Sequence, residues 1–171
     1  MKAILRTYGK DESFSDAFPD LPDDFDFTNP EAAPFPVGSN QRLIRIPSFR
    51  ELNSFARAYV GCALWSTTDE STEAGGEPFD ANYGPEDIAP ATLARMAEGC
   101  RQFQIDNEAF LTEAELSDER AGFLFWLNRN GHGSGFWDEG SEPVFRRLSD
   151  ASKVWGTFDL YLGDDGQIHG S

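Results

Sequence analysis

Positive charge is scarce in this sequence of 171 residues. Lys and Arg together number 14 against 30 Asp and Glu, which gives a formal net charge of -16 at pH 7. Proteins that bind nucleic acid directly need Lys and Arg to contact phosphate, and adhesion to an anionic membrane depends on the same residues. The composition therefore predicts no direct binding to nucleic acid or to a membrane, and it favours cationic partners.

Cysteine and long apolar runs are also rare. The two cysteines, Cys62 and Cys100, are too few for a disulfide framework and lie in apolar, helix-like patterns that are typical of buried thiols. Residues 1–6 turn polar too early for a signal peptide, and no run of about 18 apolar residues occurs. We expect a soluble protein of a reducing cytoplasm.

Core-forming residues, in contrast, are plentiful. Hydrophobic residues make up 39% of the chain and aromatic residues 13%, with 15 Phe and 4 Trp, which excludes a wholly disordered chain. The length suits one ordinary domain. We predict a single domain over residues 1–171, with an arm at 11–40 and a body at 41–171.

The negative charge is concentrated in part of the chain. Residues 11–119 contain 23 acids and six arginines, whereas residues 120–171 contain seven acids and five bases. Residues 11–40 alone hold eight acids, five prolines and five phenylalanines. Because proline excludes a regular helix, we expect an irregular acidic arm whose Phe side chains pack across the body or a partner.

Three helices are predicted by apolar residues at helical spacing. The first covers about 49–66 and follows a capping-box pattern, in which Ser48 and Glu51 satisfy each other's backbone N–H groups. The second runs from Pro90 to about residue 111. The third spans 143–155 and ends at a left-handed cap on Gly156.

Apolar segments without helical spacing predict strands. Residues 122–127 have the pattern of a strand buried on both faces, with 136–138 as its hairpin partner. Alternation at 158–162 and an Asp-Gly turn predict a second hairpin with 167–169, and a short strand is expected at 43–46. The elements indicate an α+β fold with a small, mainly antiparallel sheet, a C-terminal β-β-α-β-β order and helices packed on one face.

Few residues suggest chemistry. The glycine-rich segment 130–135 lacks the Gly-Lys-Ser/Thr ending of a P-loop and is better explained as a structural turn. His132, Asp138 and His169 could form an acid–base pair or a mixed metal site, although their spacing matches no established ligand pattern. We predict no catalytic residue, metal or cofactor, and we keep an enzyme or metal-binding module built on these three residues as an alternative.

The acidic residues have two interpretations. They commonly form a solvated surface that keeps a protein soluble. However, carboxylates three or four positions apart on a helix lie about 5–6 Å from one another, within a factor of two of the charge spacing along a nucleic-acid strand. The second interpretation is a partial nucleic-acid mimic, and the residues predicted to contact its partner are Asp20, Asp23, Asp24, Asp26, Glu86, Asp87, Glu98, Asp106, Glu113 and Glu115.

A motif of aromatic residues and glycines occupies residues 125–138, FWLNRNGHGSGFWD, and a second segment occupies 159–168, DLYLGDDGQI. With residues 80–90, these segments resemble a family of small uncharacterised proteins encoded by bacteriophages and some plasmids. The resemblance covers about the last two-thirds of the chain, excludes the arm and brings no catalytic residues. It implies a context in which small acidic proteins often inhibit host defence systems, such as restriction enzymes or CRISPR complexes.

Charge and resemblance together lead to one hypothesis. The chain is expected to be a phage or mobile-element accessory protein of the host cytoplasm, which binds a basic host protein or ribonucleoprotein complex. Its acidic surface would block the cationic groove of a nucleic-acid-processing complex. Two alternatives stay open: the enzyme or metal-binding module described above, and a structural or interaction domain without catalysis.

Overall fold

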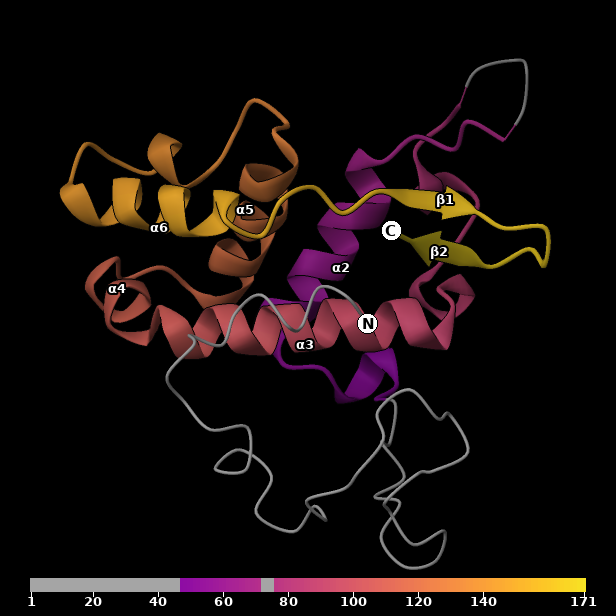
Figure 1. The fold of residues 1–171 in the computed structure, drawn as a ribbon, viewed down its shortest axis with the longest axis horizontal. Coiled ribbons are helices and arrows are strands. Elements are labelled where there is room, and N and C mark those ends of the chain that lie inside the picture. The colour runs from indigo at the N-terminus through magenta and orange to yellow at the C-terminus, as the bar shows by residue number, and fades with distance from the viewer. Residues whose placement is uncertain (1–46, 72–75) are drawn as a thin grey trace, which may run out of the picture. The chain divides into compact units, whose positions relative to one another are not determined.

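The structure, a computed structural model, describes residues 47–71 and 76–171 (Figure 1). They belong to one compact unit, Arg45–Ser171. Several predicted features lie outside the described residues, namely the arm at 11–40, the strand at 43–46, and Asp20, Asp23, Asp24 and Asp26.

The described part of the chain is mostly helical and contains a two-stranded antiparallel sheet, in agreement with the predicted α+β class. None of its helices is both long enough and apolar enough to cross a membrane. The elements in chain order are η2 (Phe49–Glu51), α2 (Ser54–Ser66), η3 (Phe79–Ala81), η4 (Pro85–Asp87), α3 (Pro90–Asp106), α4 (Glu108–Glu113), α5 (Asp118–Asn130), η5 (Phe136–Asp138), α6 (Pro143–Lys153), β1 (Leu160–Leu162) and β2 (Ile168–Gly170).

The first predicted helix is confirmed from residue 54 onward. The Glu51 side chain does reach back to Ser48, and its carboxylate accepts the Ser48 backbone N–H at 2.9 Å. This pairing closes only the single 3-10 turn η2, because Leu52 is extended. Helix α2 begins after Asn53, whose side-chain oxygen accepts the Ala56 N–H at 2.9 Å, so a second cap starts the regular helix.

The second predicted helix is divided in two. Helix α3 begins at Pro90 as expected and ends at Asp106. Asn107 is buried, and its side-chain amide donates to the Phe103 carbonyl at 2.9 Å. This bond satisfies one of the last carbonyls of α3, and the chain then turns into the short helix α4.

The strand predicted at 122–127 is wrong, because these residues lie inside α5. The helix is capped by Ser117, whose hydroxyl accepts the Arg120 N–H at 3.1 Å, and it ends at Gly131 in the left-handed conformation. Nearly all of its middle is buried. A helix surrounded by protein is apolar on every side, so it shows no helical period. The predicted hairpin partner, 136–138, is also wrong and forms the 3-10 turn η5.

The last helix and the last hairpin are confirmed. Helix α6 begins at Pro143 and ends at Lys153, and Gly156 follows with a φ of 64°. Strands β1 and β2 pair in antiparallel register, with Tyr161 opposite His169. The first two strands of the predicted β-β-α-β-β order are therefore absent from the described residues, and its α-β-β end is correct.

The hairpin is docked on the N-terminal half of α3. The Ala89 N–H donates to the Ile168 carbonyl at 2.9 Å, and the Gly170 N–H donates to the Thr92 hydroxyl at 3.1 Å. Leu160 and Ile168 are buried, whereas Tyr161 on the opposite face of the hairpin is exposed. Leu160 and Ile168 thus join the hairpin to the hydrophobic core.

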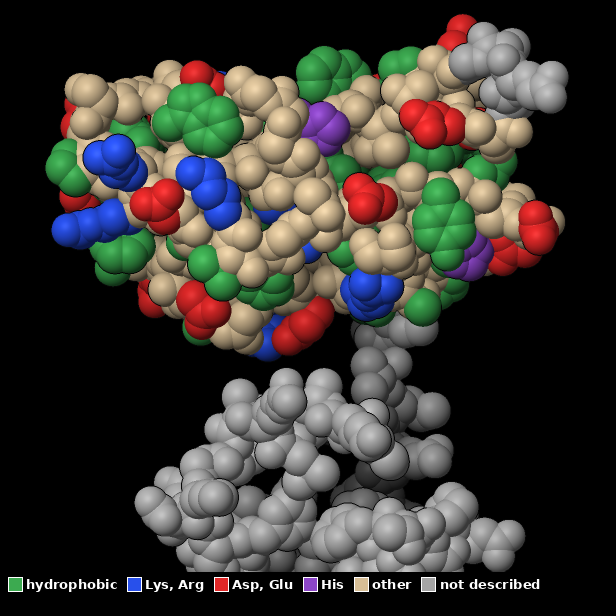
Figure 2. Space-filling view, turned by 45° about the horizontal axis from the view of Figure 1, so that its top comes forward, with side chains coloured by type: hydrophobic (Ala, Val, Ile, Leu, Met, Phe, Trp, Pro, Cys, Tyr) green, Lys and Arg blue, Asp and Glu red, His purple; other side chains and the backbone are tan. Residues whose placement is uncertain are grey.

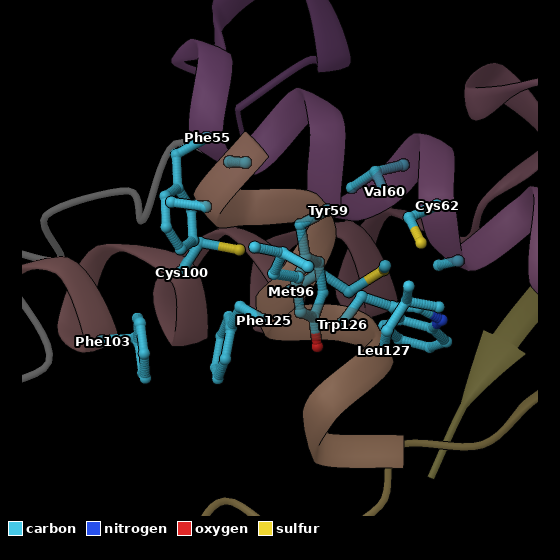
Figure 3. Close-up of a cluster of buried hydrophobic side chains, with 14 of the residues drawn as sticks. Phe55, Tyr59, Val60, Cys62, Met96, Cys100, Phe103, Phe125, Trp126 and Leu127 are labelled. Carbon is cyan, nitrogen blue, oxygen red and sulfur yellow. The ribbon is translucent and has the colours of Figure 1, made fainter. Parts of the chain in front are cut away.

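The core lies between α2, α3 and α5, which cross closely (Figure 3). The rings of Phe103 from α3 and Phe125 from α5 stack with centroids 4.0 Å apart. Helices α2 and α5 approach so closely at Gly122 that a Cβ atom there would lie 2.8 Å from the Phe55 carbonyl carbon. The core formed by these three helices also includes Leu160 and Ile168 of the hairpin.

Candidate functional site

Six of the predicted partner-binding acids are described, and they do not form one compact patch. Glu86 and Asp87 lie in η4, ahead of the first turn of α3, whereas Asp106 is its last residue. With a rise of 1.5 Å per residue, these ends are about 24 Å apart. The acids thus extend along the length of α3 and continue into α4.

Three of these acids have local partners. Asp87 accepts the Gly84 N–H at 2.7 Å and so caps η4. Glu98 pairs with Arg101 through two bonds of 2.8 and 2.6 Å, and these hydrogen bonds hold the pKa of the Glu98 carboxyl below its ordinary value. Asp106 accepts from the Gln102 side chain at 2.7 Å. These contacts compete with any interaction that the carboxylates make with a partner.

A second group of acids is more available. Residues 108–119, called the acidic segment here, contain five acids and no base. All five are exposed, and none forms an ion pair within residues 47–71 and 76–171. The predicted partner-binding set includes Glu113 and Glu115 but not Glu108, Asp118 and Glu119, although the run of acids without a base is visible in the sequence.

The face shown in Figure 2 carries both acidic and basic side chains. On the face shown in Figure 2, the red carboxylate side chains lie separately, and blue Lys and Arg side chains gather on the side that carries α6. Helix α6 contributes Arg146, Arg147 and Lys153. This face is therefore not uniformly acidic.

The glycine-rich segment 130–135 connects α5 to η5 and acts as a structural turn. Gly131 and Gly133 have φ angles of 69° and 74°, which favour glycine. The Asp138 carboxylate accepts the Ser134 hydroxyl at 2.7 Å and the Gly135 N–H at 3.0 Å. Both hydrogen bonds lower the pKa of Asp138, and the one from Ser134 has the larger effect.

The two histidines lie in different surroundings. His132 stacks on Trp126 with ring centroids 6.5 Å apart, whereas His169 bonds to the Asp165 carboxylate at 3.0 Å and stacks on Tyr161 at 5.7 Å. Figure 2 shows the two purple side chains apart on the surface. The structure thus brings neither histidine into contact with the other or with Asp138, and the described residues contain no group of three His, Cys, Asp or Glu that could hold a metal ion.

A groove with a volume of about 560 Å³ lies beside His132. Three segments that are distant in sequence form its walls: residues 66–71 after α2, residues 126–132 at the end of α5, and residues 158–162 along β1. Sequence reasoning missed this groove, because no local pattern indicates that these segments meet.

Partly buried hydrogen bonds hold the walls of the groove together. The Trp126 indole N–H donates to the Ser66 hydroxyl at 2.8 Å and so joins α5 to α2. The Asn130 amide donates to the Trp126 carbonyl at 3.1 Å, and its oxygen accepts the Phe158 N–H at 2.7 Å. These bonds fix the chain that leads into β1 against the end of α5.

Arg129 fixes the same junction from the other side. Its guanidinium donates to the carbonyls of Gly156 at 2.8 Å and Trp155 at 3.0 Å, and to the Tyr59 hydroxyl at 2.8 Å. One side chain therefore links α5, α2 and the chain after α6. The motif at 125–138 supplies most of the groups that assemble the groove.

No protein-family model matches the chain, and no curated protein or solved structure shows significant similarity to it. The resemblance carried by residues 125–138 and 159–168 accordingly remains a sequence-based expectation.

Proposed function

We propose that this protein is a phage or mobile-element accessory protein that binds a basic host protein or ribonucleoprotein complex. The contact is made by the acidic segment, Glu108 to Glu119, and by neighbouring acids along α3. Binding blocks the cationic groove of a nucleic-acid-processing defence complex of the CRISPR or restriction type. The observation that carries the proposal is the set of five exposed carboxylates without an ion pair among the described residues.

The amount of charge supports a partial mimic. Residues 86–119 contain nine acids and two arginines, a net charge of -7. One nucleic-acid strand carries one phosphate per 3.4 Å, so seven negative charges equal those of about seven nucleotides. Within α3 itself two acids are balanced by two arginines, so the excess negative charge lies in η4 and in the acidic segment, beyond the two ends of the helix.

The acidic segment is also held in place before it binds. Ala114 is buried and Phe110, Leu111 and Leu116 pack against the core, and the guanidinium of Arg147 lies 5.3 Å from the Phe110 ring centroid. Carboxylates on an ordered backbone lose less conformational entropy when they bind. Packing of α4 thus favours recognition by a preformed surface.

A capture experiment with the full chain tests the proposal. The triple variant Glu108→Gln, Glu113→Gln, Glu115→Gln removes three charges from the acidic segment. The control Glu77→Gln, Asp80→Asn, Glu142→Gln removes three exposed charges elsewhere. Asp87 is not suitable, because its carboxylate caps η4.

The readout is inhibition as well as capture. Host proteins retained by the wild-type chain are identified, and the purified complex is then tested for binding of a labelled DNA duplex or guide RNA. We expect the wild-type chain and the control to block that binding, and the acidic-segment variant to lose both capture and inhibition. Equal behaviour of the two triple variants would refute the assignment of the acidic segment.

A further inference from the structure

We propose that the groove beside β1 is a separate binding site, which takes an extended, arginine-bearing peptide segment of a partner protein. The peptide pairs with the free edge of β1 and places an arginine among the rings and carboxylates of the groove. The site shares no residue with the acidic segment, so each proposal can be tested without the other.

The groove combines an apolar floor with acidic walls. Its floor includes Trp126, which is 1% exposed, together with buried Phe79 and Phe158. Glu70 and Asp159 are exposed residues of the walls. The residues that line the groove include three acids, Asp69, Glu70 and Asp159, one histidine and no Lys or Arg.

The polar groups near the floor are already bonded. Ser66 accepts from Trp126 and itself donates to the Cys62 carbonyl at 2.8 Å, and the amide of Asn130 uses both its nitrogen and its oxygen. What remains for a ligand is ring surface and carboxylate charge. A cation on an apolar stem therefore fits better than a neutral polar ligand.

Arginine matches this combination. Its planar guanidinium stacks on aromatic rings and forms paired hydrogen bonds with carboxylates. Tyr161 is 51% exposed, and the His169 ring stacked on it restricts its orientation. His132, exposed and stacked on Trp126, offers a second ring. The volume of about 560 Å³ lies in the range of ligand sites, about 300 to 1,000 Å³.

The hydrogen-bond pattern of the hairpin indicates that the ligand is a peptide. Asp159 and Ser171 exchange both of their backbone hydrogen bonds, at 3.2 and 3.0 Å. In an antiparallel pair such residues alternate with residues whose N–H and C=O point away from the partner strand. Leu160 and Leu162 therefore direct their backbone groups away from β2.

This free edge lies along the groove. Five consecutive residues, 158–162, line it, and β1 pairs only with β2 within the described residues. A peptide in extended conformation can add to such an edge as a further strand, with alternate side chains entering the groove. The negative charge of the walls selects a basic segment.

Titration of the full chain with a short peptide tests the proposal. The probe is acetyl-Thr-Arg-Thr-Arg-Thr-amide. Its binding is followed by NMR of the protein's backbone amides at about 150 mM salt, which screens weak attraction to the charged surface. We expect the amides of Leu160 and Leu162 to shift and to become protected from exchange. A citrulline peptide, which lacks the charge, and a peptide methylated at its backbone nitrogens should each bind about tenfold more weakly or worse.

Matched protein variants separate the groove from general charge. The double variant Glu70→Gln, Asp159→Asn should bind the Thr-Arg peptide about tenfold more weakly than the wild type. The double variant Glu113→Gln, Glu115→Gln should change the affinity for this peptide less than about twofold. Both pairs remove two exposed charges. The proposal would be overturned if both double variants lost the same affinity for the peptide, or if the methylated peptide bound as tightly as the unmodified one. It would also be overturned if the amides of residues 158–162 did not shift at about 5 mM peptide.

Discussion

Replacing Gly122 with alanine should destabilise the protein, although the same change normally stabilises a helix. Gly122 lies in α5 at its crossing with α2. A Cβ atom at this position would lie 2.8 Å from the Phe55 carbonyl carbon and closer still to its oxygen, whereas Cβ contacts under 3.0 Å are essentially never found. The obstacle is backbone, so no side-chain rotation relieves it.

Two opposing terms set the magnitude. Alanine is favoured over glycine within a helix by about 1 kcal/mol. Overpacking of a tight interface costs about 1–3 kcal/mol, sometimes more, and a clash with helix backbone belongs at the upper end. We therefore expect Gly122→Ala to lower the free energy of unfolding by about 2 kcal/mol.

Two other helical glycines serve as controls. Apart from the neighbouring backbone of its own helix, a Cβ atom added at Gly61 in α2 would have no atom within 4 Å, and one added at Gly99 in α3 would lie 3.6 Å from its nearest neighbour, in the Trp155 ring. Gly61→Ala and Gly99→Ala should each raise the free energy of unfolding by about 0.5–1 kcal/mol. Urea unfolding followed by tryptophan fluorescence measures all three. A Gly122→Ala variant as stable as these controls would refute the close approach of α2 and α5.

Three further changes examine other parts of the structure. Arg129→Lys should lower the free energy of unfolding in urea by about 2–3 kcal/mol, because lysine cannot bond to Tyr59, Trp155 and Gly156 together; an unchanged urea midpoint would contradict this role. Burial raises the pKa of Cys62 to about 12 and also raises the pKa of Cys100, so a thiol reagent at about pH 8 should label neither until the protein is denatured. Ser134→Ala should raise the pKa of Asp138 toward that of free aspartate, as measured by NMR titration. Because folding lowers the pKa of Asp138, the ionised carboxylate stabilises the folded protein at pH values above the unfolded pKa of about 4. This contribution is lost as the pH falls through the pKa that Asp138 has in the folded protein. The stability difference between Ser134→Ala and the wild type should therefore shrink in acid, and a constant difference would show that the carboxylate charge is not involved.

Local patterns were sufficient for the elements with one buried face. Helix α6 starts at a proline and is followed by Gly156 with a positive φ, and the final hairpin turns at Gly166 with a φ of 75°. Each signal depends on residues next to one another in sequence. Such elements are predictable without knowledge of the rest of the fold.

Helix α5 could not be predicted from periodicity, because other elements surround it. Its buried residues 121, 122 and 124–128 cover every side of the helix. Aromatic residues in such a run also have high strand propensity. The better signals were at its ends, where Ser117 precedes two acids and Gly131 follows the last turn. The groove could not be predicted for a different reason, since its three walls meet only in the folded chain.

The polar residues of the motif at 125–138 mostly serve the fold. The Asn128 amide donates to the Ser149 carbonyl at 3.0 Å, Arg129 links three segments, and Asn130 joins α5 to Phe158. Similarity confined to these residues is therefore evidence of a shared fold and says little about function.

Three exposed residues of the two motif segments line the proposed peptide groove. His132 makes a ring contact with Trp126, the described bonds of Asp159 to Ser171 are made by its backbone, and Tyr161 is half exposed. None of these side chains assembles the fold in the way that Arg129 does, yet all three line the same groove. Residues whose side chains are not needed for folding, but which the fold gathers at one site, are the ones expected to contact a partner. A protein that shares the proposed peptide binding of the groove would therefore need these three side chains in addition to the buried framework.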